Sequence, residues 1–285
     1  MVVLITGANG QLGQALQSVA GNYPEIDFVF CTSAELDIAD LQNCETIFSE
    51  IRPDFCINAA AYTAVDKAET EKEKARLINV TGAGNIAKTC KKHHTILLHI
   101  STDFVFDGNS DKPYTEEDRA NPTGVYGQTK LDGEKAIAAI FGSYYIIRTS
   151  WVYSQFGHNF MKTMIRLGKE KPQLSVVNDQ IGTPTNAVDL AEVLIQIIQV
   201  NSQHPTTNTF GIYNFSNGGQ CSWFDLAKTI FEFNNIETAV LPIGSAAYPT
   251  PAKRPKYSVL DKSKIEDTFG ITIKNWRNSL KEASK

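Results

Sequence analysis

Tyr126 and Lys130 are the side chains of this sequence best suited to moving a proton. They lie four residues apart in Val-Tyr-Gly-Gln-Thr-Lys, a stretch typical of a helix start, so both would project from one helix face. A free tyrosine titrates near pH ~10, and a close ammonium group lowers this pKa by favouring the phenolate. The same spacing also occurs on ordinary solvated helix faces, so this interpretation depends on the rest of the chain.

Two hydroxyl groups precede this pair in the sequence. The apolar run 96–100 predicts a buried strand, and Ser101 and Thr102 follow it directly. A hydroxyl at the carboxyl end of a strand can donate a hydrogen bond to the same oxygen that a tyrosine protonates. Together with Tyr126, these residues could polarise and protonate a carbonyl group.

A glycine-rich turn near the N-terminus predicts a dinucleotide site. The apolar run 2–6 is typical of a buried parallel strand, and Gly7, Gly10 and Gly13 follow it before a helical segment. The first glycine permits a tight turn, the second lets the backbone approach a pyrophosphate, and the third allows close packing of helix on strand. The helix N-terminus would attract the phosphate charge. The Gly-x-x-Gly-x-x-Gly spacing is looser than the usual pattern, so a glycine turn without a ligand is the alternative.

The choice between NADH and NADPH stays open at this stage. An NAD site usually places Asp or Glu at the end of the second strand, roughly 20 residues after the glycines. The predicted second strand, 27–31, is followed by Thr32 and Ser33, and no arginine for a 2′-phosphate stands nearby. Either cofactor is therefore compatible with these residues.

Four further positions could belong to a ligand site, and each has a structural alternative. The small residues Ala59–Ala61 at a strand end could let a flat cofactor lie against the backbone, or could serve tight packing. Trp151 could wall a substrate pocket or pack in the core. Arg254, between prolines, could bind a diphosphate or be a solvated surface residue. Asn79, inside an apolar helical segment, needs polar partners, and could brace the catalytic strand or cap a loop.

The elements that must position these residues alternate between strands and helices. Strands are predicted at 2–6, 27–31, 54–58, 95–100 and 144–149, and helices at 10–20, 40–51, 71–92 and 124–140. This alternation predicts an α/β fold of the Rossmann type, a doubly wound parallel sheet with helices on both faces.

The second half of the chain is less regular. Helices are expected at 159–168, 189–200 and 223–233, a strand at 212–215, a proline-rich loop at 242–255, and a short closing helix. We predict a dinucleotide-binding domain over 1–150, with 186–215 added to it, and a smaller lobe over 151–285 that binds the substrate. The lobe would fold over the carboxyl ends of the strands, where open α/β sheets bind ligands.

Composition excludes several classes of protein. The 285 residues carry a net charge of −4, which argues against a nucleic-acid or membrane surface. No apolar run approaches the ~20 residues of a membrane span, and the first strand begins at residue 2, which leaves no room for a signal peptide. The five scattered cysteines indicate reduced thiols in a cytoplasmic protein, and the five histidines show no metal-binding spacing.

Taken together, these motifs resemble the extended short-chain dehydrogenase/reductases, and within them the dTDP-4-dehydrorhamnose reductase family. The resemblance covers nearly the whole chain, and its last three blocks separate this group from epimerases and dehydratases of the same fold. The blocks are residues 7–13, 58–69, 101–108, 125–130, 148–153, 178–185 and 248–255. The resemblance implies NADPH- or NADH-dependent reduction of a nucleotide-linked 4-keto sugar, the last step of dTDP-L-rhamnose synthesis.

The resemblance also implies roles for individual residues. Tyr126 would protonate the C4 carbonyl oxygen, Lys130 would hold the nicotinamide ribose and lower the pKa of Tyr126, and Thr102 would bind the carbonyl oxygen. Asp103 and Trp151 would contact the sugar, and Arg254 would contact the diphosphate. The residues expected to line the cofactor, besides Tyr126 and Lys130, are Gly7, Gly10, Gln11, Leu12, Asp37, Ile38, Ala59, Ala60, Ala61 and Tyr62.

One departure from the family concerns metal and assembly. Some relatives are dimers bridged by Mg²⁺ through acidic residues near the first helix, where this chain reads Gly13-Gln-Ala-Leu without an acid. We therefore expect no essential metal, and a monomer or weak homodimer.

Two rival functions stay open. One is a non-catalytic NADP-binding regulator like the β subunit of methionine adenosyltransferase, which shares this fold. The other is a reductase of a different nucleotide-linked keto sugar.

Overall fold

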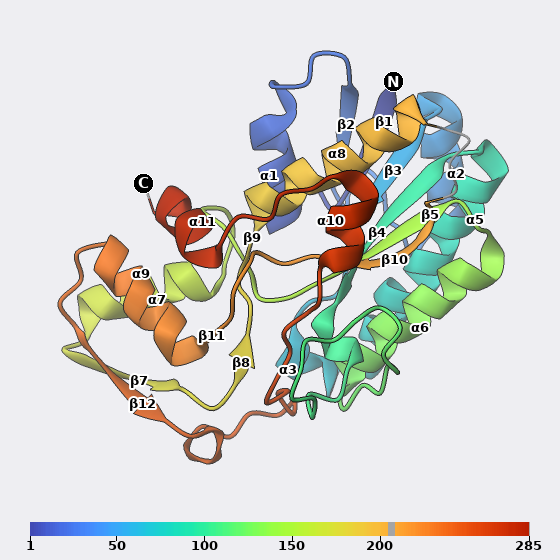
Figure 1. The fold of residues 1–285 in the computed structure, drawn as a ribbon. Coiled ribbons are helices and arrows are strands. Elements are labelled where there is room, and N and C mark those ends of the chain that lie inside the picture. The colour runs from blue at the N-terminus through green and yellow to red at the C-terminus, as the bar shows by residue number, and fades with distance from the viewer. Residues whose placement is uncertain (205–208, 285) are drawn as a thin grey trace.

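A six-stranded parallel sheet forms the centre of the computed structural model, which describes residues 1–204 and 209–284 (Figure 1). The strand order is β10-β5-β4-β3-β1-β2, and every paired neighbour is parallel. The strands are β1 (Val2–Thr6), β2 (Asp27–Cys31), β3 (Phe55–Asn58), β4 (Ile96–Thr102), β5 (Tyr144–Thr149) and β10 (Gly211–Asn214). The five strands predicted in the first half and the returning strand near 212–215 are therefore confirmed.

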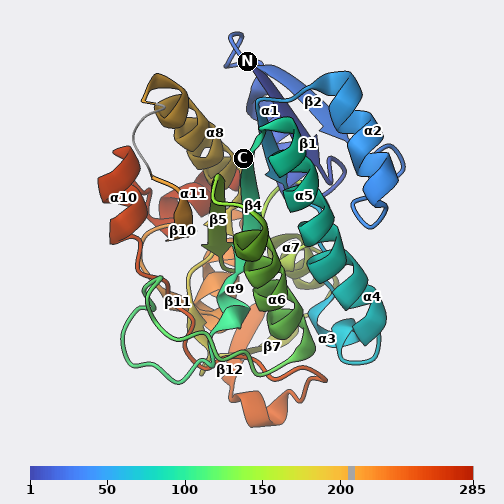
Figure 2. The ribbon, with the colours of Figure 1, turned by 90° about the vertical axis from the view of Figure 1, so that its right-hand side faces the viewer.

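Both faces of the sheet are buried under helices (Figures 1 and 2). Val3 and Ile5 pack on the side of α1 (Gln11–Ala20) and α8 (Ala187–Gln203), with α10 (Ser263–Phe269) beside them. Leu4 points the other way, toward α2 (Leu41–Ile51), α5 (Ala83–His93) and α6 (Val125–Ile140). Because neighbouring strand residues face opposite sides, a strand buried on both faces is mainly apolar, as residues 2–5 are, and the buried Thr6 hydroxyl donates to Asn58 Oδ1. The α/β fold class is confirmed.

The predicted helix 71–92 is continuous but changes its winding. It runs as α4 (Lys72–Arg76), a π-helical segment η1 (Leu77–Gly82), and α5, with the short α3 (Val65–Ala68) before it. π-Helical turns are rare and widen the backbone locally, often beside functional sites. Here the segment holds Asn79, which faces α6.

A smaller lobe lies at the carboxyl ends of the strands (Figure 1). A second apolar cluster joins α7 (Phe160–Glu170), α9 (Trp223–Phe233) and α11 (Trp276–Ala283) to the strand β7 (Gln173–Val177). Three two-stranded pairings complete it, and they join β12 (Ala239–Ile243) to β7, β11 (Cys221–Ser222) to β8 (Ile181–Gly182), and β6 (Val152–Tyr153) to β9 (Thr185–Asn186).

The predictions for the second half are met in part. The helices expected at 159–168, 189–200 and 223–233 correspond to α7, α8 and α9. The expected loop 242–255 begins inside β12 and contains the 3₁₀ turn η3 (Ser245–Ala247), and the single closing helix is two helices, α10 and α11.

The proposed division into two domains stays a prediction. Elements α8 and β10, from the predicted addition 186–215, do pack with the main sheet, as does α10 from the later part of the chain. Residues 205–208 and 285, which the predicted boundaries include, lie outside the described residues. Within 1–204 and 209–284, no helix has the length and apolar character to cross a membrane.

Candidate active site

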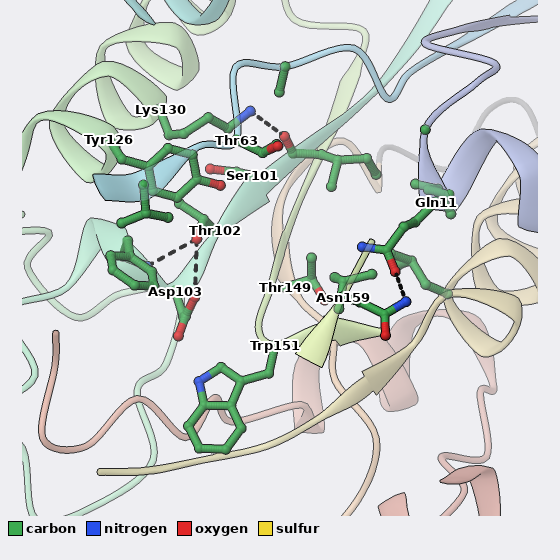
Figure 3. A pocket seen from close by; sticks show the side chains of 18 of the residues that line it. Gln11, Thr63, Ser101, Thr102, Asp103, Tyr126, Lys130, Thr149, Trp151 and Asn159 are labelled. Atoms are coloured by element: carbon green, nitrogen blue, oxygen red, sulfur yellow. Dashed lines mark hydrogen bonds between the residues drawn. The ribbon is translucent and has the colours of Figure 1, made fainter. Parts of the chain in front are cut away.

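One cavity of ≈ 690 Å³ brings most of the predicted site residues together (Figure 3). Tyr126, Lys130, Ser101 and Thr102 lie on one side of it, and Gln11 and Trp151 lie across from them. The predicted residues that line it are Gly10, Gln11, Leu12, Ala59, Ala61, Thr102, Asp103, Tyr126, Lys130, Trp151 and Arg254.

A hydroxyl and a carboxyl group lie beside the Tyr126 phenol. Thr102 ends β4, and its Oγ1 donates to Asp103 Oδ1 at 3.1 Å and accepts from Phe104 N at 3.2 Å. Asp103 Oδ2 has no hydrogen-bond partner within the described residues, although the Ser258 hydroxyl lies close enough to favour its charged form. Burial raises the pKa of Asp103 to about 6. Asp103 lines the cavity, and a carboxylate there is an acceptor for a ligand hydroxyl.

Lys130 is buried beneath the cavity. Its Nζ donates to the Ile100 carbonyl oxygen at 2.6 Å and lies 3.4 Å from His99 Nε2. Burial lowers the pKa of Lys130 to about 8, against the opposing charge of Glu134. Burial and the Lys130 charge together hold the pKa of His99 well below its usual value, so the imidazole stays neutral.

The expected effect of Lys130 on Tyr126 is not found in the structure. Burial raises the pKa of Tyr126 to about 12, with a partial opposing effect from the Thr102 hydroxyl and a further rise from the Asp103 charge. Lys130 is not among the groups that shift the pKa of Tyr126, and its ammonium group donates to the Ile100 carbonyl oxygen. Tyr126 is therefore a phenol at neutral pH, which is the form that can donate a proton.

The start of α6 places Tyr126 and Lys130 through unusually close backbone contacts. Glu69 Oε1 accepts from Val125 N at 2.8 Å and so caps the helix from outside, since Gly124 at the N-cap has no side chain. A Cβ on Gly127 would lie 2.1 Å from Phe104 O, and one on Gly133 would lie 2.2 Å from Asn79 O. The helix can pack this closely only because these positions are glycine.

Asn79 ties this helix to the strand ends. Its Oδ1 accepts from Tyr62 N at 2.9 Å, and its Nδ2 donates to Tyr62 O at 3.1 Å and to Thr129 Oγ1 at 3.1 Å. Asn79 thus holds both the loop after β3 and α6. Of the two roles open on sequence, these bonds match the holding of a loop, and they add a bond to α6 in place of one to the catalytic strand β4.

The glycine turn fits a bound dinucleotide. Gly7 has φ +68°, and a Cβ there would meet Ala60 N at 2.9 Å, while a Cβ on Gly13 would lie 2.6 Å from Ala8. A Cβ on Gly10 would approach only one atom, Gly7 O at 3.2 Å, so the space before Gly10 belongs to the cavity. Gly10 caps α1 without a side-chain hydrogen bond, and this leaves N–H groups of the first turn available to phosphate oxygens.

Five of the predicted cofactor residues do not line the cavity. Gly7 and Ala60 pack against each other below it, and Tyr62 packs beside Ala68 and Ala75. Asp37 is exposed and accepts from Ala39 N, and Ile38 is buried against Gly82. The carboxyl end of β2 still borders the glycine turn, because Ala8 N donates to Cys31 O at 3.1 Å.

Trp151 stands at the far wall in a constrained geometry. Its φ is +47°, a region that costs non-glycine residues energy and is often found at functional sites. The indole ring stacks on Trp223, with 3.6 Å between ring centroids, and lies where a Cβ on Gly182 would come within 2.6 Å. Both tryptophans line the cavity.

Arg254 reaches the cavity from the proline-rich segment. Its Nη2 donates to Asp66 Oδ2 at 2.7 Å, and its buried Nη1 has no partner among the described residues. Arg254 lines the cavity, and a guanidinium group there favours an anionic ligand.

Several neighbours of the site were not predicted. Glu134 forms a buried pair with Arg148 at 2.7 Å and accepts from the Ser101 hydroxyl. His99 was detectable, because a histidine interrupts the apolar run 96–100. Trp223 and Asn159, which bonds Gln11 Oε1 at 2.9 Å, come from distant elements and carry no local signal.

Among the described residues, no group of three or more His, Cys, Asp or Glu side chains could hold a metal ion. The expectation that the protein needs no metal stays a prediction.

Comparison with known proteins extends over the whole chain. A family model described as the RmlD substrate binding domain matches residues 1–285. A crystal structure of a dTDP-4-dehydrorhamnose reductase from Clostridium acetobutylicum is 42% identical with a TM-score of 0.93, covering 99% of this chain and 98% of that one. One from Bacillus anthracis, in complex with NADP, is 40% identical with a TM-score of 0.94 and the same coverage.

A curated relative from Escherichia coli K12 agrees with these structures. This dTDP-4-dehydrorhamnose reductase is 40% identical over 292 residues, which span 99% of this chain and 96% of the relative. Identity at this level over full length, together with the shared fold, shows that the chain belongs to the dTDP-4-dehydrorhamnose reductase family, a family of oxidoreductases.

Proposed function

We propose that this protein reduces the C4 keto group of dTDP-4-dehydro-L-rhamnose to give dTDP-L-rhamnose, with NADPH or NADH as reductant. The main support for this proposal is that Tyr126, Lys130 and Thr102 line the same cavity as the glycine turn before α1. Membership of the family supplies the substrate, and the relative from Bacillus anthracis in complex with NADP supports the cofactor class.

The proton comes from Tyr126 in this proposal. A reduced nicotinamide bound in the cavity would supply the hydride. As negative charge develops on the substrate carbonyl oxygen, the Tyr126 phenol donates its proton and the Thr102 hydroxyl donates a hydrogen bond. The pKa of about 12 keeps Tyr126 protonated before the reaction, as a donor requires.

Lys130 would bind the cofactor from the same side of the cavity as Tyr126. Because the Ile100 carbonyl oxygen holds Nζ, the ammonium group has further N–H donors available for a cofactor ribose.

The cofactor would lie along the glycine turn. The free N–H groups of the first turn of α1 would bind its pyrophosphate, with Gly10, Gln11 and Leu12 in contact. Ala59 and Ala61 would border the nicotinamide side. Gly7, Ala60 and Tyr62 would shape this wall from behind, and Asp37 and Ile38, in the loop between β2 and α2, would border the adenosine.

The substrate would occupy the opposite part of the cavity. Asp103, which lines the cavity, would accept a hydrogen bond from a sugar hydroxyl through its carboxylate. The Trp151 indole would form the wall beside the sugar, and the Arg254 guanidinium would bind the diphosphate.

The test is a turnover assay with a panel of substrates. Purified protein is mixed with NADPH and dTDP-4-dehydro-L-rhamnose, and loss of the reduced-nicotinamide absorbance is followed, then repeated with NADH and with UDP- and GDP-linked keto sugars. We expect turnover with the dTDP sugar. Stoichiometric NADPH binding without turnover of any keto sugar would instead identify a regulator, and faster turnover of a UDP or GDP sugar would identify a different reductase.

A further inference from the structure

The segment 249–255, which we call the strap, passes from η3 to the wall of the cavity. It has few hydrogen bonds within itself. It contains Pro249, Pro251 and Pro255, which stiffen it but donate no backbone hydrogen bonds. Its internal hydrogen bond runs from the Thr250 hydroxyl to Ala252 O at 2.8 Å. The strap therefore depends on contacts with the rest of the protein for its position.

The hydrogen bonds among those contacts converge on a single carboxylate, while Pro255 packs against Gly108. Asp66 Oδ1 accepts from Ala252 N at 3.2 Å, and Asp66 Oδ2 accepts from Arg254 Nη2 at 2.7 Å. Among the described residues, these are the hydrogen bonds that attach 249–255 to another part of the chain. The flanking segments are held separately, by Ser245 on Asp179 and by Tyr257 N on Gly108 O.

Asp66 and the strap come from opposite ends of the sequence. Asp66 lies on α3, just after β3 and the loop that Asn79 braces, whereas the strap follows β12 of the smaller lobe (Figure 1). The carboxylate thus joins the two walls of the cavity. Arg254 lies between these walls, with its Cζ 6.0 Å from the Phe104 ring centroid. Its Nη1 is buried and has no hydrogen-bond partner among the described residues.

We propose that Asp66 is a positioning residue that fixes the strap and aims the free side of the Arg254 guanidinium at the substrate diphosphate. The inference rests on the proposed function, because it requires a nucleotide diphosphate in the cavity. A guanidinium held by a carboxylate on one edge keeps its other N–H groups in a fixed plane, which suits phosphate oxygens. Asp66 would contribute to substrate affinity without touching the substrate.

Binding of dTDP, measured by calorimetry on the full-length protein saturated with NADP, provides the test. Arg254→Ala removes a charge-assisted contact and should weaken dTDP binding by about 10- to 100-fold. Asp66→Ala should weaken it by about 10-fold, and adding Asp66→Ala to Arg254→Ala should change little, because the two residues act as a unit. Asp66→Asn keeps one acceptor oxygen and should give an intermediate loss.

Two control measurements distinguish a specific effect of Asp66 on Arg254 from a general disturbance of the fold. Thymidine has no phosphate, so its affinity should be equal in wild type and Asp66→Ala. Asp179→Ala releases the neighbouring turn at Ser245 without touching Arg254, and should leave dTDP affinity within about twofold. Unchanged NADPH affinity and an unchanged melting temperature in Asp66→Asn would show that the fold is intact.

The outcomes are distinct. If wild type binds dTDP and Asp66→Ala and Asp66→Asn bind it equally well, the role of Asp66 is refuted and the proposed function stands. Additive losses in the double variant would likewise refute it, because Asp66 would then act independently of Arg254. If wild type does not bind dTDP at all, both the inference and the proposed substrate fail.

Discussion

Asp103 and Glu134 are both buried carboxyl groups close to Tyr126 or its helix, yet their surroundings differ. Glu134 has a guanidinium partner in Arg148, with hydrogen bonds of 3.0 and 2.7 Å. Within the described residues, Asp103 forms no ion pair, and its neighbours are the Thr102 and Ser258 hydroxyls. A buried carboxylate without compensation favours its protonated form. At the scale of single residues, Asp103 is therefore a group whose ionisation costs folding free energy.

This cost predicts a pH dependence of stability. Because the folded-state pKa of Asp103 is raised from 3.8 to about 6, its contribution to stability is fully present below the unfolded pKa and is lost as pH rises through about 6. Asp103→Asn cannot ionise and should escape this loss, which amounts to roughly 3 kcal/mol for a shift of this size.

Urea unfolding of wild type and Asp103→Asn between about pH 4 and 7 measures the difference. The variant should gain stability relative to wild type as pH rises. A difference that stays constant with pH, or that changes in the other direction, would show that Asp103 is not held protonated in the fold.

The sequence predicted which residues form the site, but not all of their chemical properties. The types and spacing of Tyr126, Lys130 and Thr102 indicated a proton-donating site, and the cavity does unite them. The pKa of Tyr126 was not predictable, because it depends on burial and on where the Lys130 ammonium points. Such quantities are set by tertiary contacts that no local pattern encodes.

At the scale of elements, the close packing of α6 against η1 determines where the site residues stand. Gly133→Ala would place a Cβ 2.2 Å from Asn79 O, so the helix must shift. Overpacking of this kind costs about 1–3 kcal/mol. Because Tyr126 and Lys130 lie on the same helix, we also expect kcat to fall, while the affinity for NADPH changes less.

Gly84→Ala provides a matched control for this variant. Gly84 lies in α5, which also packs on α6, and a Cβ there would make only ordinary contacts at 3.9 Å. It should leave kcat unchanged and raise stability by roughly 0.5–1 kcal/mol, as expected for alanine in a helix. Thermal melting and steady-state kinetics of both variants check the pair. Equal effects of the two substitutions would contradict the packing argument.

Regular elements followed from the sequence, whereas short pairings did not. The strands of the sheet carry apolar runs bounded by turns, and α9 has clear amphipathic spacing. The two-residue strands β6, β8, β9 and β11 have no periodicity, because each exists only through a partner distant in sequence. The π-helical turn in 71–92 was also missed, since its sequence reads as a normal helix.

At the scale of the whole molecule, two lobes meet at the carboxyl ends of the strands and form the cavity between them. The sheet lobe supplies Tyr126 and the glycine turn, and the smaller lobe supplies Trp223. An expected lobe over the strand ends could be predicted from general rules for open α/β sheets. The residues that this lobe contributes to the cavity could not be predicted, because they come from separate segments of the chain.

Metal dependence is a property of the whole molecule that can be tested directly. The first turn of α1 has no acidic residue, so a metal bridge there lacks ligands. Dialysis against EDTA should leave kcat and the sedimentation coefficient unchanged. Loss of activity or of a dimer on EDTA treatment, restored by Mg²⁺, would overturn this expectation.

The central claim is that the Tyr126 hydroxyl protonates the substrate ketone, and Tyr126→Phe tests it most directly. The variant keeps the ring and its edge-to-face contact with Phe104 but loses the proton. We predict that kcat for dTDP-4-dehydro-L-rhamnose falls at least ~100-fold, with NADPH affinity and melting temperature retained. Tyr145→Phe, in β5 outside the cavity lining, should keep kcat. Turnover of Tyr126→Phe close to that of wild type would contradict the account.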